Sequence, residues 1–123
     1  AGWRRQYVMK RLDSIGVKYY YYELPPFEVV NNLYNILDLY VVAARYEGGP
    51  QAIVECAASK CPIISTDVGI SSDILNKSSI FKPNEVLLAS PDVDHAHKKV
   101  QDLLAPNGFA GFVDMFNKII VGN

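Results

Sequence analysis

Hydrophobic residues near the start of the chain recur with a period close to that of an α-helix. Between Trp3 and Ile15 they alternate with arginines and lysines, and Gly16 follows, a common residue just beyond a helix. This pattern predicts an amphipathic helix with a basic outer face. The next segment, Val17–Tyr22, is rich in β-branched and aromatic residues and is followed by two prolines, so it is predicted to be a strand.

Farther along, helical patterns alternate with short, continuous apolar runs, which are typical of strands covered on both faces. Prolines in first helical turns and glycines at breaks mark the ends of these elements. The sequence predicts helices over residues 25–36, 50–59 and 73–75, and buried strands over 39–43 and 63–66. It also predicts a strand over residues 86–89 and helices over 92–104 and 109–121.

The alternation of strands and helices predicts an α/β fold. Helices that connect successive strands act as right-handed crossovers, so the strands form a parallel sheet with helices on its faces. A chain of 123 residues has room for one such core. We therefore expect a Rossmann-like sheet in a single domain over residues 1–123, with its ligand outside the carboxyl ends of the strands.

Composition narrows the functional class. Half of the residues are hydrophobic, a fifth are charged, and 12 basic against 13 acidic residues give a formal net charge of −1. These values are typical of a globular protein and argue against a disordered tail or a general nucleic-acid binder. The sequence has neither a bilayer-spanning apolar run nor a signal-peptide pattern. We therefore expect a cytoplasmic chain, with any membrane association made through regions outside this sequence.

The spacing of cysteine and histidine does not predict a metal site. Cys56 and Cys61 lie in an apolar passage from helix to strand, and no second pair accompanies them, so we expect buried, reduced thiols. His95 and His97 are two residues apart and would point in different directions on a helix. We expect no bound metal.

The stretch Arg45–Glu55 combines a strand end, a glycine-proline loop and a helix start. The free N–H groups of the first helical turn and the helix dipole form an anion site at such a position. Gly48 and Gly49 allow a ligand to approach the backbone closely, because they have no side chain. We therefore expect backbone groups to bind a phosphate where the Pro50 helix begins.

Two glutamates flank this expected anion site. Glu55 lies one helical turn above it, where a carboxylate would repel phosphate but can accept hydrogen bonds from a hydroxyl pair such as a ribose diol. Glu47 lies in the loop and can address hydroxyls on the opposite side of the phosphates. Taken alone, both residues are also explained as ordinary acids of a loop and of a solvated helix face.

The glutamate pair and its surroundings resemble the acidic signature of retaining nucleotide-sugar glycosyltransferases of family 4, the group 1 glycosyl transferases with the GT-B fold. Leu33 and Tyr34 with Asp38–Val42 look like the strand that enters the loop in that family, and Pro62–Gly69 looks like the strand and turn that leave it. The matches together cover residues 17–75, roughly half the chain.

This resemblance implies the C-terminal, donor-binding part of an enzyme that transfers a hexose from an NDP-sugar, either UDP- or GDP-linked, to an unknown acceptor with retention of configuration. It assigns Glu47 to the transferred sugar, as the catalytic contact, and Glu55 to the ribose. No metal or other cofactor is implied. Backbone N–H groups at the helix start are expected to hold the diphosphate, in the loop made up of Gly48, Gly49, Pro50, Gln51 and Ala52.

The sequence also departs from the family pattern. Lys60 stands where a helix-ending glycine is usual, Gly49 where a larger residue is common, and Ile70 in place of the second of two glycines. The family's basic phosphate clamp, its N-terminal domain and the first two strands of its C-terminal domain are not in this sequence. We therefore expect the isolated chain to be inactive as a transferase and prone to associate, with the missing N-terminal domain or a swapped copy as its partner.

Other interpretations stay open at this point. The chain is alternatively a non-catalytic module that binds a nucleotide sugar or a phosphate. A flavodoxin-like signalling domain is disfavoured, because no acidic cluster follows a first strand. The side chains of Tyr19–Tyr22 either stack on the base of a nucleotide, or lie on an edge strand with their rings packed and their hydroxyl groups in contact with water.

Overall fold

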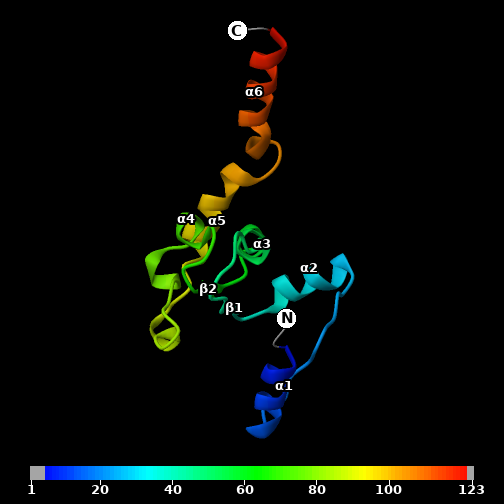
Figure 1. The fold of residues 1–123 in the computed structure, drawn as a ribbon, viewed down its shortest axis with the longest axis vertical. Helices are drawn as coiled ribbons and strands as arrows, with labels where there is room; N and C mark the ends of the chain where they lie inside the picture. The colour runs from blue at the N-terminus through cyan, green and yellow to red at the C-terminus, as the bar shows by residue number, and fades with distance from the viewer. Residues whose placement is uncertain (1–4, 122–123) are drawn as a thin grey trace. The chain divides into compact units, whose positions relative to one another are not determined.

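The structure, a computed structural model, describes residues 5–121. The chain divides into two units, one that ends at Asn31 and one that begins at Asn32. Figure 1 labels the elements of both. The boundary falls within α2, Phe27–Ile36, which follows the two prolines as predicted.

The first unit holds α1, Arg5–Ser14, which confirms the predicted N-terminal helix, although Trp3 lies outside the described residues. No residue of α1 is buried. Arg5 forms an ion pair with Glu23, and its guanidinium carbon lies 5.9 Å from the centre of the Tyr21 ring. Exposed ion pairs contribute little to stability. The local sequence pattern therefore accounts for this helix better than its contacts do.

The strand predicted over Val17–Tyr22 is wrong, because this segment has no regular secondary structure. A strand needs a neighbour to satisfy its backbone groups, and no strand in residues 5–121 pairs with this segment. Its side chains are not packed on a sheet edge either, since Tyr20 is 90% exposed. High β-propensity reflects packing against neighbours and does not form a strand by itself.

The second unit contains two parallel strands connected through a helix. β1, Tyr40–Val42, pairs with β2, Ile63–Ser65, with Tyr40 opposite Ile63 and Val42 opposite Ser65. α3, Gln51–Ser59, connects them and packs on β2. An isolated parallel bridge from Ser65 to Ile80 adds a short third segment. The α/β class and the parallel pairing are confirmed, whereas two of the four predicted strands form within the described residues.

The rest of the second unit is helical. The predicted helices near residues 73–75, over 92–104 and over 109–121 are confirmed to within a few residues, the second as an α-helix continued by a 3₁₀-helix. With η denoting 3₁₀-helices, the elements are α4 (Ser71–Ile74), η1 (Lys77–Ser79), η2 (Val86–Leu88), α5 (Val93–Val100), η3 (Gln101–Leu103), η4 (Asn107–Phe109) and α6 (Ala110–Val121).

The strand predicted over residues 86–89 is wrong, because these residues form η2 and the turn that follows it. The Glu85 N–H donates to the Lys82 carbonyl at 2.7 Å, and the Leu88 N–H donates to the Glu85 carbonyl at 2.9 Å. Leu87 and Leu88 are both exposed. Consecutive tight turns therefore use the backbone groups of this segment locally.

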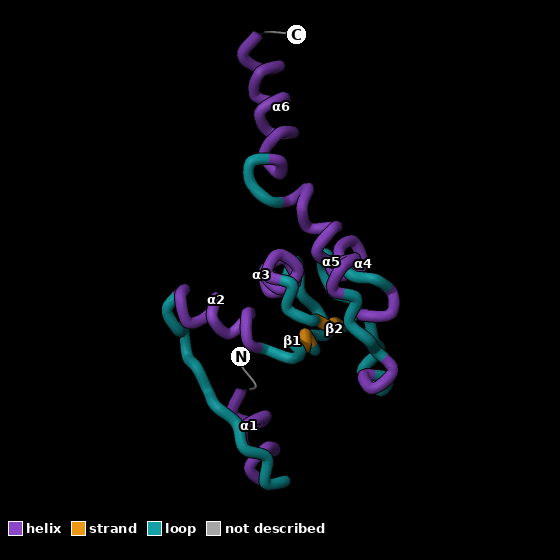
Figure 2. Tube along the Cα trace, turned by 180° about the vertical axis from the view of Figure 1, so that it is seen from behind, coloured by secondary structure: helices purple, strands orange, loops and turns teal. Residues whose placement is uncertain are grey.

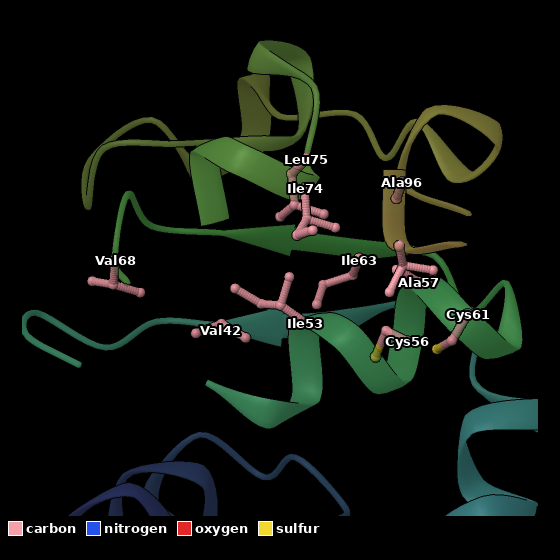
Figure 3. Close-up of a cluster of buried hydrophobic side chains, with 11 residues drawn as sticks. Val42, Ile53, Cys56, Ala57, Cys61, Ile63, Val68, Ile74, Leu75 and Ala96 are labelled. Carbon is pink, nitrogen blue, oxygen red and sulfur yellow. The ribbon is translucent and has the colours of Figure 1, made fainter. Parts of the chain in front are cut away.

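The core of the second unit lies among β1, β2, α3, α4 and α5, which gather together in both views of the chain (Figures 1 and 2). All three residues of β2 are buried, as predicted, but Val41 in β1 is 46% exposed, so β1 is not covered on both faces. Figure 3 shows the apolar side chains that meet there. They are Val42, Ile53, Cys56, Ala57, Cys61, Ile63, Val68, Ile74, Leu75, Ala96 and Val100.

α3 ends at a left-handed residue although that residue is not glycine. Lys60 has φ 58° and ψ 26°, and its N–H donates to the Cys56 carbonyl. The Cys61 N–H donates to the same carbonyl at 2.9 Å. This turn leads the chain directly into β2, at a cost of about 1 kcal/mol relative to glycine.

Candidate functional site

The loop between β1 and α3 presents glycine backbone at the carboxyl end of a strand. Pro50 is the N-cap residue of α3 and makes no side-chain capping bond. Pro50 is buried, whereas Gly48 and Gly49 are exposed. A Cβ atom on either glycine would meet no atom within 4 Å. The first turn of α3 and the two glycine peptides are therefore accessible to a ligand.

The turn after β2 packs against this glycine loop. Gly69 has φ +52°, and a Cβ atom there would lie 2.9 Å from the carbonyl carbon and oxygen of Gly48 and from Cδ of Pro50. Backbone atoms cannot move aside as a flexible side chain can. Gly69 is thus required both by its left-handed conformation and by this contact, which fixes the glycine loop relative to β2.

Glu47 lines an open hollow of about 560 Å³, named here the Glu47 hollow. The Glu47 side chain is exposed, so its carboxylate is available to accept hydrogen bonds from ligand hydroxyls. The lining comes from the loops that follow β1 and β2, and consists of Arg45, Tyr46, Glu47, Gly48, Asp67, Val68 and Gly69.

Glu55 lines a second hollow, of about 290 Å³, on the Gly49 side of the loop. This Glu55 hollow is lined by Gly49, Pro50, Gln51, Val54, Glu55 and Ile70. Because Gly48 borders the first hollow and Gly49 the second, the glycine loop separates the two glutamates. Six of the seven predicted site residues thus line hollows around one loop, and Ala52 is half-buried in the first turn of α3.

A tyrosine that sequence reasoning missed holds Glu55. The Tyr34 hydroxyl donates to Oε2 of Glu55 at 2.6 Å, and the Tyr34 and Tyr40 rings lie 5.7 Å apart between centroids. Burial raises the pKa of Tyr34 well above its ordinary value, and the bond to Glu55 raises this pKa further. The phenol therefore stays protonated and remains a donor. The contact joins residues 21 positions apart, so no local pattern indicates it.

The two faces of α3 serve different purposes. Ile53, Cys56 and Ala57 are buried and anchor the helix in the core. On the other face, Gln51 and Glu55 line the Glu55 hollow. The buried residues and the polar residues that line the hollow thus lie on different faces of α3.

A third hollow, of about 390 Å³, borders the Glu47 hollow and is named here the Lys82 hollow. The Phe81 N–H donates to the Ser65 carbonyl at 2.9 Å, so Lys82 follows a segment that is paired in parallel with β2. No sequence pattern indicates Lys82, because a paired segment this short shows no periodicity. The hollow is lined by Ala44, Arg45, Tyr46, Thr66, Asp67, Val68, Phe81, Lys82 and Pro83.

Both cysteines are buried, as predicted, and they form no disulfide with each other. Burial raises the pKa of the Cys56 thiol, and the neighbouring Cys61 raises it further. Burial also raises the pKa of Cys61. Protonated thiols are poor nucleophiles and poor metal ligands, so both cysteines act as core residues.

Within residues 5–121, no three or more His, Cys, Asp or Glu side chains are grouped as a metal site would require. The helices in the same range are all too short or too polar to cross a membrane.

His97 is used structurally, since its Nδ1 donates to the Ala57 carbonyl at 2.9 Å.

Comparison with known proteins gives two matches. Residues 20–110 match the family described as glycosyl transferases group 1. The chain is also 38% identical over 58 residues to protein CapJ of Staphylococcus aureus. That alignment covers 47% of this chain and 15% of CapJ. No solved structure matches significantly. The family match includes the glycine loop, both glutamates and all three hollows.

Proposed function

Because the chain belongs to the group 1 glycosyl transferases, we propose that it is the donor-binding, C-terminal part of a retaining GT-B enzyme of glycosyltransferase family 4. The donor is an NDP-sugar, either UDP- or GDP-linked, and the transferred group is a hexose. Family membership favours this role over that of a non-catalytic binding module. The observation that carries the proposal is the exposed glycine loop with a separate glutamate-lined hollow on each side.

The donor is proposed to lie across the glycine loop. Its diphosphate contacts the backbone N–H groups of Gly48, Gly49, Gln51 and Ala52, where the helix dipole favours negative charge, while Pro50 has no N–H to donate. Its ribose hydroxyls donate to Glu55 in the smaller hollow, and its hexose lies in the larger hollow against Glu47.

Tyr34 is a positioning residue in this arrangement. One carboxylate oxygen of Glu55 accepts the Tyr34 hydroxyl, which holds the side chain while leaving further lone pairs for the ribose. A carboxylate with a fixed direction loses less conformational entropy when it binds a ligand than a free one does. The Tyr34 contact therefore favours a preorganised ribose site.

The transfer step exchanges one bond for another. The bond between the anomeric carbon and the donor phosphate oxygen breaks, and the nucleoside diphosphate keeps the electron pair. A bond forms on the same face of this carbon to an acceptor hydroxyl oxygen, and the hydroxyl proton passes to the departing phosphate oxygen. Backbone N–H groups and the α3 dipole stabilise the charge that develops on the diphosphate, so the proposal requires no metal.

The acceptor site and part of the active site are proposed to lie on an N-terminal domain. The 123-residue chain would then bind the donor but transfer no sugar by itself. A chain extended upstream through both domains is expected to turn over the donor. Turnover by the 123-residue chain alone would contradict this division of roles.

Calorimetric titration of the 123-residue chain with UDP, GDP and their hexose derivatives tests the proposal. One nucleotide series is expected to bind, and Glu55→Ala should weaken binding of both its nucleotide and its nucleotide sugar by roughly 10- to 100-fold, since a charge-assisted hydrogen bond is lost. Glu85→Ala is the matched control, because Glu85 is exposed and lines none of the three hollows. Equal affinity of the Glu55 variant and this control would refute the ribose assignment.

A further inference from the structure

A second carboxylate residue, Asp67, lines the Glu47 hollow. Glu47 comes from the loop that follows β1, and Asp67 comes from the turn that follows β2. The carboxyl ends of parallel strands meet at one edge of a sheet, which is where α/β proteins bind ligands. Both acids therefore border the place proposed for the hexose, although the donor arrangement described above uses only Glu47.

The Asp67 side chain is exposed, yet a buried residue holds it. Oδ1 of Asp67 accepts a hydrogen bond from Oγ of Ser71 at 3.3 Å, and the same Oγ accepts one from the Val68 N–H at 2.8 Å. Ser71 lies in α4 and is 0% exposed, so the group that directs Asp67 is fixed in the packed part of the unit. Oδ2 and the remaining lone pairs of the carboxylate are available to ligand hydroxyls.

The two loops that carry the acids are fixed against each other. Glu47 directly precedes Gly48, and Asp67 precedes Gly69 by two residues. Because Gly69 packs closely on Gly48, neither loop moves far without the other. Two carboxylates on such a frame can accept hydrogen bonds from different hydroxyls of one sugar and so set the orientation of its ring.

The lining of the Glu47 hollow carries more negative than positive charge. Arg45 stands against Glu47 and Asp67 there. Neither Arg45 nor Lys82, which lines only the neighbouring hollow, forms an ion pair within residues 5–121. A sugar hydroxyl donates to a carboxylate, whereas a sugar that itself carries a carboxylate is repelled by one. The hollow is therefore suited to a neutral sugar and unsuited to an acidic one.

We propose that Asp67 is a second sugar-contacting residue, which selects a neutral hexose over the corresponding hexuronic acid. This inference rests on the proposed function, because that function places the hexose in the Glu47 hollow. Glu47 and Asp67 each accept a hydrogen bond from a hexose hydroxyl. A hexuronate differs from its hexose only at C6, where a carboxylate replaces the hydroxymethyl group, so the two sugars test charge at nearly constant shape.

Calorimetric titration of the 123-residue chain with matched donors tests the selection. The ligands are UDP-glucose with UDP-glucuronate, UDP-galactose with UDP-galacturonate, and the GDP counterparts if only GDP binds. The unmodified chain is expected to bind the preferred hexose derivative about 10-fold more tightly than its hexuronate, because the two carboxylates accept from the first and repel the second.

Asp67→Asn removes the charge but keeps an oxygen that can accept from Ser71. This variant is expected to narrow the preference for the hexose to about threefold or less, because one of the two repelling charges is gone. Asp73→Asn is the matched control, because Asp73 is exposed on α4 and lines none of the hollows. An equal preference in the two variants, or no preference in the unmodified chain, would overturn the inference.

Titration with the free nucleotides separates failure of this inference from failure of the proposed function. If neither UDP nor GDP binds, the proposed function fails, and this inference fails with it. If a nucleotide binds and Asp67→Asn leaves the preference for the hexose unchanged, this inference alone is refuted.

Discussion

The segment from β1 to α5 and the two terminal helices have similar sequence patterns but different burial. Both α3 and α6 alternate apolar and polar positions with a helical period. α3 buries Ile53, Cys56 and Ala57, while neither α1 nor α6 buries any residue. An amphipathic pattern therefore predicts a helix, but only the presence of a packing partner decides whether its apolar side stabilises the fold.

Apart from Tyr34 of α2, the candidate site lies in the segment from β1 to α5. The loops that follow β1 and β2 begin at core strands, and the close contact of Gly69 with Gly48 fixes these two loops against each other. A ligand site needs backbone groups at fixed positions, which a packed core provides and an exposed helix does not. The glycine loop therefore has fixed backbone groups because it adjoins the packed core, which the exposed terminal helices do not.

An isoleucine in each region gives the largest expected difference in stability. Ile53 is 0% exposed in α3, whereas Ile119 in α6 is 68% exposed. Ile53→Ala is expected to lower the free energy of unfolding by about 2–5 kcal/mol, because it removes buried methyl groups and leaves a cavity. Ile119→Ala should change it by less than about 0.5 kcal/mol. Urea denaturation followed by circular dichroism measures both, and similar losses would show that α6 is buried in solution.

Alanine substitutions at two glycines with positive φ distinguish the cost of backbone strain from the cost of a steric clash. Gly69 and Gly16 have φ of +52° and +70°, but a Cβ atom has nothing within 4 Å at Gly16. Gly69→Ala is expected to cost about 3 kcal/mol, from strain plus displacement of the glycine loop, and to weaken nucleotide binding. Gly16→Ala is expected to cost about 1–2 kcal/mol, from strain alone. Thermal melts and nucleotide titrations of both variants check this, and unimpaired binding by Gly69→Ala would argue against a rigid loop.

The N-cap of α5 provides a smaller, pH-dependent effect. The His95 N–H and the Asn76 amide both donate to the Asp92 carboxylate and lower the pKa of Asp92 below its ordinary 3.8. A lowered pKa means that this contribution to stability is present above the unfolded-state pKa and is lost as pH falls through the folded-state pKa. Asp92→Ala is therefore expected to melt a few degrees lower at pH 7, with a difference that shrinks as the pH falls below the ordinary 3.8 and the carboxylate of the folded chain becomes protonated.

Asp114→Ala in the exposed helix α6 is the matched control for Asp92. Its melting temperature is expected to equal that of the unmodified chain at both pH values, since Asp114 caps no helix. A pH-independent deficit for Asp92→Ala would show that packing of the side chain, rather than its charge, stabilises α5.

Much of the fold follows from local sequence. The runs that became β1 and β2 are short, apolar and bounded by helix breakers, and Pro50 marks the start of α3, so these elements are predictable without partners. Val17–Tyr22 has an equally suitable composition but no strand beside it within the described residues, so it stays irregular. Strand formation depends on distant neighbours, which local patterns do not describe.

For the candidate site too, sequence patterns predict the residues that are close together in the chain but not those that come from distant segments. The glycine loop and its two glutamates are contiguous in sequence, so their joint placement could be anticipated. Tyr34 and Lys82 come to the site from segments outside the loop, one through α2 and the other after a segment bridged to β2. Their positions beside the loop became visible only when the tertiary contacts were known.

The central claim is that the hexose of the donor lies against Glu47, and one comparison of affinities tests it most directly. Calorimetry of Glu47→Ala is carried out with the preferred nucleotide and with its hexose derivative, beside the unmodified chain. The account predicts that affinity for the nucleotide sugar falls by about 10-fold while affinity for the free nucleotide changes less than about twofold, because Glu47 contacts only the sugar. Equal losses for both ligands, or no loss for either, would contradict it.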